Sequence, residues 1–163
     1  MRKRAKIFSA VLWTLSLAWI VFIFANSMKT GSESGQMSGS ATELINGFLH
    51  TLSPSLSVSH LFVRKAAHFS EFAVLACLFC GALWTGFIVP IEERVSLKRL
   101  CIVLLALPCS VAVAATDETI QRFVAGRVGA ITDVLIDSAG AATATLIFFL
   151  VIVLFGKRNK DKS

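Results

Sequence analysis

Three short segments of this chain carry side chains that could do chemistry together. The first begins at Arg64 and Lys65 and reaches His68 and Glu71 within two helical turns. Residues 68 and 71 are one turn apart, so in a helix the imidazole and the carboxylate share a face. Such a pair is able to transfer a proton as acid and base, or to contribute ligands to a metal ion.

The second segment lies at the end of another apolar run. Asp117 and Glu118 are followed by Gln121 at helical spacing, and a Gly126-Arg127 pair further on indicates a turn. These polar residues continue a run that is otherwise hydrophobic, so we expect them at the end of a helix rather than in its middle.

The third segment contains two carboxylates at the start of an apolar run. Asp133 and Asp137 are four residues apart, and Gly140 and Ala144 continue the same helical stripe. Small residues on one stripe let two helices approach closely. We therefore expect this helix to pack on a neighbour with its acids facing inward.

The elements that position these segments are apolar helices. The 163 residues are 55% hydrophobic and 16% charged, and their mean hydropathy is +0.74. A soluble core of this size could not hide several apolar runs, whereas a membrane helix needs roughly 20 such residues. We predict one all-α domain over residues 1–163, a bundle of four transmembrane helices at about 7–25, 64–89, 97–116 and 131–155. Pro108 is expected to kink the third helix.

Basic residues flanking these spans predict the orientation of the protein. With the N-terminus inside, the inner segments contain eleven basic residues: Arg2, Lys3, Arg4, Lys6, Arg94, Lys98, Arg99, Lys157, Arg158, Lys160 and Lys162. The outer segments contain five: Lys29, Arg64, Lys65, Arg122 and Arg127. We expect a multi-pass protein of the inner (cytoplasmic) membrane, with both termini and the tail 156–163 cytoplasmic. The net charge of +6 follows from this bias, so we expect no nucleic-acid partner.

The outer loop, residues 26–63, divides into two parts. Residues 27–40 are rich in Ser and Gly and are expected to lack regular structure. Ser40 and Glu43 then form a potential capping box, followed by apolar residues at helical spacing from Leu44 to Leu52. We predict a short amphipathic helix that lies on the outer membrane surface or packs on the bundle. The four cysteines lie inside apolar runs, which is not typical of a disulfide framework.

The alternating topology brings the three polar segments to the outer end of the bundle. The candidate polar pocket consists of Arg64, Lys65, His68, Glu71, Asp117, Glu118, Gln121, Arg127, Asp133 and Asp137. Helices two, three and four supply it, and the first helix is expected to contribute nothing. Two interpretations remain open: an ion-pair network that joins the helices, or a pocket that binds a ligand.

A metal site is a further alternative within this group. His68, Glu71, Asp133 and Asp137 offer one imidazole and three carboxylates, a set suited to zinc or manganese. The chain contains no compact ligand motif such as HExxH, so we predict no cofactor.

The same residues resemble the VanZ-like family of membrane proteins. The resemblance lies in Arg64-Lys65-x-x-His68-Phe69-x-Glu71-Phe72-x-x-Leu75, in Asp117-Glu118-x-x-Gln121-x-Phe123-x-x-Gly126-Arg127, and in Asp133-Val134-Leu135-x-Asp137-x-x-Gly140. It covers about residues 20–145. The family often has Tyr at the position of Phe72 and Asn at that of Asp137, which puts in doubt any mechanism that needs a neutral amide at 137.

The resemblance implies a bacterial envelope protein associated with resistance to the glycopeptide teicoplanin, and it names no reaction. We expect a protein that binds an outer-leaflet ligand, such as a lipid-linked peptidoglycan precursor, a glycopeptide or a membrane lipid head group. The alternatives are a small membrane enzyme that acts on a lipid with His68 and Glu71 as its acid–base pair, and a purely structural assembly factor. An enzyme is the less favoured reading, because no nucleophile stands beside a base.

Overall fold

The computed structural model describes residues 2–88 and 101–158, and within them all regular structure is helical. Helix α1 spans Arg2–Ser27, α2 spans Gly31–Leu52 and α3 spans His60–Leu83. A π-helical turn, η1 (Trp84–Ile88), continues α3, and a 3-10 turn, η2 (Val103–Leu105), precedes α5 (Ala106–Gln121). The last helix is α6 (Ile131–Arg158).

Four helices are long and apolar enough to cross a membrane. These segments are Lys3–Ser27, His60–Phe87, Val103–Gln121 and Ile131–Leu154. The prediction of an all-α protein with four transmembrane helices is therefore confirmed, and the chain is a multi-pass membrane protein. Residues 97–100 of the predicted third span lie outside the described residues.

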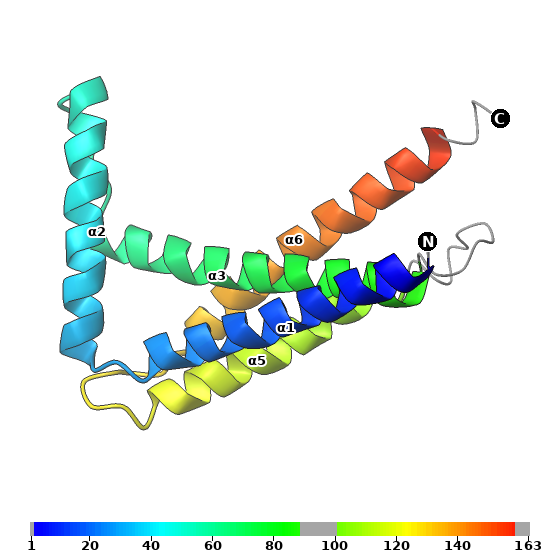
Figure 1. Cartoon of the computed structure of the whole chain (residues 1–163). Helices are drawn as coiled ribbons and strands as arrows, with labels where there is room; N and C mark the ends of the chain where they lie inside the picture. The colour runs from blue at the N-terminus through cyan, green and yellow to red at the C-terminus, as the bar shows by residue number, and fades with distance from the viewer. Residues whose placement is uncertain (1, 89–100, 159–163) are drawn as a thin grey trace.

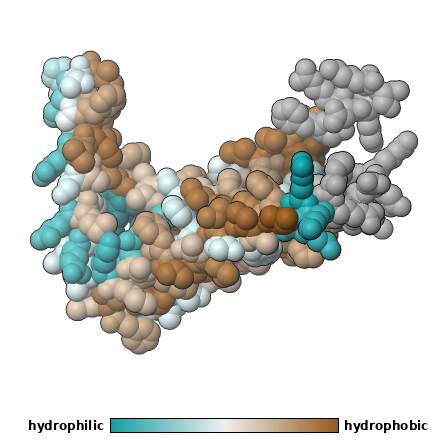
Figure 2. Space-filling view, viewed as in Figure 1, coloured by the Kyte–Doolittle hydropathy of each residue, from teal (hydrophilic) through white to brown (hydrophobic). Residues whose placement is uncertain are grey.

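The four helices of the candidate membrane spans, α1, α3, α5 and α6, form one bundle, and α2 stands across one of its ends (Figure 1). Helix α1 begins and α6 ends at the opposite end, as an even number of spans requires. Figure 2 shows a largely hydrophobic surface along the bundle, with hydrophilic residues at the α2 junction and at the start of α1. Apolar side chains such as Leu17, Val21 and Leu135 are exposed on this surface, which is the arrangement that lipid, not water, stabilises.

Helices α3 and α6 approach each other closely. A Cβ atom at Gly140 of α6 would collide with the backbone carbonyl of Phe69 on α3, so only glycine permits this approach. Ala76, Ala141 and Ala144 are buried beside it. The expectation of a closely packed stripe on this helix is thus met by its geometry.

The loop prediction for residues 27–40 is wrong, because α2 begins at Gly31. Thr30 is its N-cap: the Glu33 N–H donates to Thr30 Oγ1 (3.3 Å), and the Thr30 N–H donates to Glu33 Oε2 (2.8 Å). This is a capping box, whereas the predicted box at Ser40 and Glu43 lies inside the helix. The Ser38 hydroxyl donates to the Ser34 carbonyl one turn earlier, so this serine is compatible with the helix. The position of α2 relative to the membrane stays a prediction.

Pro108 does not kink the interior of a helix. It lies in the first turn of α5, directly after the 3-10 turn η2. A proline costs little there, because the first backbone N–H groups of a helix have no carbonyl partner within it.

We predict that Gly140→Ala lowers the free energy of unfolding of the detergent-solubilised protein by about 1–3 kcal/mol, the usual cost of overpacking. Its Cβ would have to displace the backbone of Phe69. To measure the effect, the protein is heated in detergent and the folded fraction at each temperature is determined by size exclusion. The matched control is Gly47→Ala on α2, where a Cβ meets nothing within 4 Å. Equal effects of the two changes would contradict the assigned role of Gly140.

Candidate functional site

The site is built where the α1–α2 turn meets the loop between α5 and α6. The Gly31 N–H donates to the Ala125 carbonyl (3.0 Å). Gly126 has a φ of 74°, a conformation that glycine adopts without strain, and a Cβ on Gly31 would collide with its backbone. The glycine in the Gly126-Arg127 pair is therefore explained by a tight turn and a close backbone contact.

Arg127 joins these two segments through three of the five N–H donors of its guanidinium group. Its Nε donates to the Lys29 carbonyl (3.2 Å), and Nη2 donates to the Asn26 carbonyl (3.0 Å). Its Nη1 donates to Gln121 Oε1 (2.9 Å). Burial, and after it the charge of Arg64, lowers the pKa of Arg127, although an arginine stays protonated under ordinary conditions.

Two carboxylates of α5 are buried at the same level. Ser27 Oγ donates to Asp117 Oδ1 (2.5 Å), and Gln121 Nε2 donates to Asp117 Oδ2 (2.8 Å). Glu118 Oε1 accepts the backbone N–H of Ala130, which closes the loop onto the helix. Glu118 Oε2 has no hydrogen-bond partner among the described residues.

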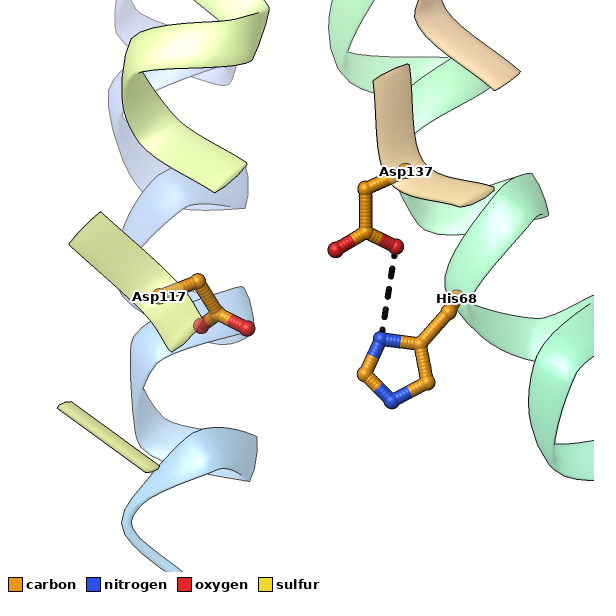
Figure 3. Close-up of side chains that lie close together, drawn as sticks. All are labelled: His68, Asp117 and Asp137. Atoms are coloured by element: carbon orange, nitrogen blue, oxygen red, sulfur yellow. Dashed lines mark ion pairs between the residues drawn. The ribbon is translucent and has the colours of Figure 1, made fainter. Parts of the chain in front are cut away.

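His68 of α3 faces Asp137 of α6. Its Nδ1 lies 3.4 Å from Asp137 Oδ1, close enough for an ion pair but without the geometry of a hydrogen bond. Asp137 is fully buried, and neither of its oxygens has a hydrogen-bond partner in the described chain. The Asp117 carboxylate points toward the same space, and one ligand atom from each of the three residues lies within 4.8 Å of the others (Figure 3).

The remaining acids on α3 and α6 have other partners. Glu71 Oε1 accepts from Asn26 Nδ2 (3.4 Å), and Trp19 Nε1 donates to the Glu71 backbone carbonyl (2.9 Å). Lys65 Nζ lies 3.4 Å from Asp133 Oδ1. The Lys65 side chain is 38% exposed, so this pair contributes little to stability.

A pocket of about 210 Å³ opens between α2, α3 and the α1–α2 turn. Its polar and ionisable lining consists of Asn26, Ser27, Lys29, Ser34, Ser38, Arg64, His68, Glu71 and Arg127. Of the residues predicted from sequence, the pocket contains Arg64, His68, Glu71 and Arg127. Asp117, Glu118, Gln121 and Asp137 are buried in the bundle, and Lys65 and Asp133 form a pair outside the pocket lining.

The expectation that the first helix contributes nothing is wrong. Asn26 and Ser27 at the end of α1 bond to Glu71 and Asp117, and Lys29 just beyond it lines the pocket. The sequence did contain a signal, since two polar residues, Asn26 and Ser27, end the first apolar run. The lining residues of α2 carried no such signal, because that segment was expected to be irregular.

The charges of the site are segregated rather than paired. Two ion pairs join the described residues, Lys65 with Asp133 and His68 with Asp137. The cations Arg64 and Arg127 face the pocket, while Asp117, Glu118 and Asp137 are buried in the bundle. Among residues 2–88 and 101–158, ion pairs therefore involve two of the acids of the site, Asp133 and Asp137. The described part of the chain has a pocket lined by cations beside a cluster of buried acids.

We predict that Arg127→Lys lowers the free energy of unfolding by about 1–3 kcal/mol, because lysine keeps the charge but leaves buried acceptors unpaired. Thermal denaturation in detergent measures the change. Arg122→Lys is the control, since Arg122 is exposed at the end of α5. If both variants unfold like the wild type, the guanidinium group does not hold this junction together.

Comparison with known proteins identifies the family of the chain. The model of the family described as VanZ/LLP1 matches residues 12–153, a range that contains α3, α5, most of α1 and α6, and every residue of the site. No curated protein and no solved structure matches the chain. Since the family model covers nearly the whole chain, this membrane protein belongs to the VanZ/LLP1 family.

Proposed function

We propose that this protein binds the anionic group of an outer-leaflet ligand in the pocket between α2 and α3. The observation that carries the proposal is the charge of the lining. Lys29, Arg64 and Arg127 line the pocket, and among residues 2–88 and 101–158 none of them forms an ion pair with a carboxylate. Lysine and arginine are the side chains that bind phosphates and carboxylates. The lining also contains Glu71, so cations outnumber acids in it.

The size of the pocket limits what can enter it. Its volume of about 210 Å³ lies below the roughly 300–1,000 Å³ of pockets that enclose drug-sized ligands. A phosphate-bearing head group fits this limit, with the rest of the molecule outside the pocket. The volume thus favours a lipid-linked cell-wall precursor or a lipid head group over an entire glycopeptide.

The placement of α2 supports a ligand that comes from the membrane. Leu44, Ile45, Phe48 and Leu52 are exposed on this helix, and Ser34 and Ser38 on its first half line the pocket. We propose that α2 lies at the outer membrane surface with its apolar residues in the lipid. A head group in that leaflet would then reach the pocket laterally. Retention of a cell-wall precursor there would connect the protein to teicoplanin resistance, because glycopeptides act on such precursors.

Two alternatives have weaker support. A membrane enzyme with His68 and Glu71 as its acid–base pair would need these groups to cooperate, but His68 pairs with Asp137 and Glu71 accepts from Asn26. A purely structural protein would not need unpaired cations around an open pocket. Binding measurements separate these functions.

We predict that the wild-type protein in nanodiscs binds lipid II, or an anionic phospholipid such as phosphatidylglycerol, more tightly than phosphatidylcholine. Arg64→Ala should weaken this binding about tenfold or more, since a hydrogen bond to a charged group is worth about 1.5–3 kcal/mol. Native mass spectrometry or a fluorescence titration provides the affinities, and separate titrations distinguish the precursor from the phospholipid.

Arg122→Ala removes a cation outside the pocket lining and is the matched control. If it weakens binding as much as Arg64→Ala does, the attraction belongs to the general charge of this end and not to the pocket. Wild-type protein without preference for either anionic lipid would contradict the proposed function.

We also propose that both termini are cytoplasmic, on the strength of the eleven inner and five outer basic residues. In a background without the four native cysteines, Gly47→Cys should react with a membrane-impermeant maleimide in intact cells. Lys160→Cys should react only after the cells are permeabilised. The opposite labelling pattern would show that the protein has the reverse orientation.

A further inference from the structure

The cluster of His68, Asp117 and Asp137 is assembled from three different helices. His68 comes from α3, Asp117 from α5 and Asp137 from α6, and Figure 3 shows their polar groups directed into one space. One potential ligand atom of each lies within 4.8 Å of the others. Both aspartates are almost completely buried, and the histidine side chain is 15% exposed.

The protein itself does not satisfy the polar atoms of this cluster. His68 Nδ1 and both carboxylate oxygens of Asp137 are buried and have no hydrogen-bond partner among the described residues. Buried polar atoms nearly always have partners, because an unpaired one costs free energy. A buried carboxylate without any hydrogen bond is especially unfavourable. The cluster therefore has the properties of a site that is completed by something other than the chain.

We propose that His68, Asp117 and Asp137 bind a divalent transition-metal ion, zinc or manganese. One imidazole nitrogen and two carboxylates suit these ions, and their double positive charge balances the two aspartates. In tetrahedral coordination at about 2.1 Å, neighbouring ligand atoms are about 3.4 Å apart. The His68–Asp137 separation is 3.4 Å. Three protein ligands leave one position open for water or another ligand.

The surroundings of Asp117 are those of an oriented metal ligand. Ser27 Oγ and Gln121 Nε2 each donate to one of its oxygens, and Arg127 in turn donates to Gln121. Each carboxylate oxygen has two lone pairs, so these bonds leave capacity for a metal. Outer partners of this kind fix the direction of a ligand and tune its affinity.

The proposed ligand set differs from the one that sequence spacing suggested. Glu71 accepts from Asn26 and Asp133 pairs with Lys65, so neither joins the cluster. Asp117 takes their place. Glu71 on α3 and Asp133 on α6 are acids at the same end of the bundle as the cluster. Their amide variants are therefore matched controls for Asp137→Asn.

The test uses the full-length protein, purified in detergent through a tag that does not bind metals. Elemental analysis by mass spectrometry should find about one zinc or manganese ion per chain. In Asp137→Asn and His68→Gln this ratio should fall below about a tenth of the wild-type value, while Glu71→Gln and Asp133→Asn keep it. Size exclusion and membrane abundance confirm that each variant is folded.

A second measurement needs only the wild-type chain. After chelation, added Zn²⁺ or Mn²⁺ should raise the melting temperature, and Mg²⁺ at the same concentration should not, since an ion that binds the folded state stabilises it. The inference is overturned if the wild type contains neither metal and neither ion stabilises it. Equal metal loss in Glu71→Gln and Asp133→Asn would overturn the assignment of ligands.

This inference does not rest on the proposed anionic ligand, because every proposed metal ligand is a protein atom and no lipid enters the test. Metal bound without lipid preference would leave the metal site standing and overturn the proposed ligand. Lipid preference without bound metal would leave the proposed anionic ligand standing and overturn the metal site.

Discussion

The close approach of α3 and α6 at Gly140 is the contact on which the site depends. Phe69, whose carbonyl occupies the space of the absent side chain, is the neighbour of His68 in the sequence. Asp137 precedes Gly140 by three residues and therefore lies on the same stripe of α6. The same contact that brings the two backbones together thus sets the imidazole opposite the carboxylate. A larger residue at 140 would separate the helices and, with them, the two polar groups.

Buried acids so near this contact need hydrogen-bond partners or cations to offset the loss of hydration. The three acids differ in how many hydrogen bonds they have. Asp117 has two hydrogen bonds and Glu118 has one to a backbone N–H, whereas Asp137 has none among the described residues. The cations that could neutralise these groups lie in the pocket or pair elsewhere. Arg127 in particular donates its hydrogen bonds to two carbonyls and an amide, and so organises the junction without neutralising an acid. This unevenness is not what a structural ion-pair network would show, and it is the observation that supports the proposed metal site.

Much of the fold follows from the sequence, because lipid imposes length and composition on each span. The four apolar runs and their polar outer ends could be identified from residue types alone. The beginning of α2 could not, since Ser and Gly disfavour a helix and the sequence from 31 to 40 is rich in both, although the Thr30–Glu33 capping box begins one there. The composition of the proposed metal site could not be identified from residue types either. Spacing shows which residues share a face of one helix, as His68 and Glu71 do, but the rotation of each helix against its neighbours decides that Asp117 rather than Glu71 meets His68.

The depth of His68 connects the pocket with the buried cluster. From Phe87, the end of the second span far from α2, to His68 the helix rises through 19 residues, or roughly 28 Å. The hydrocarbon core is about 30 Å thick, so a span that enters it at Phe87 has His68 near the opposite edge, at the end of the bundle where α2 lies. His68 also belongs to both the pocket lining and the cluster. A head group held by Arg64 and Arg127 would therefore stand next to the proposed metal ion, whose open coordination position could accept one of its oxygens. Helices α3, α5 and α6 and the α1–α2 turn thus place the cations of the pocket lining next to the cluster of His68, Asp117 and Asp137.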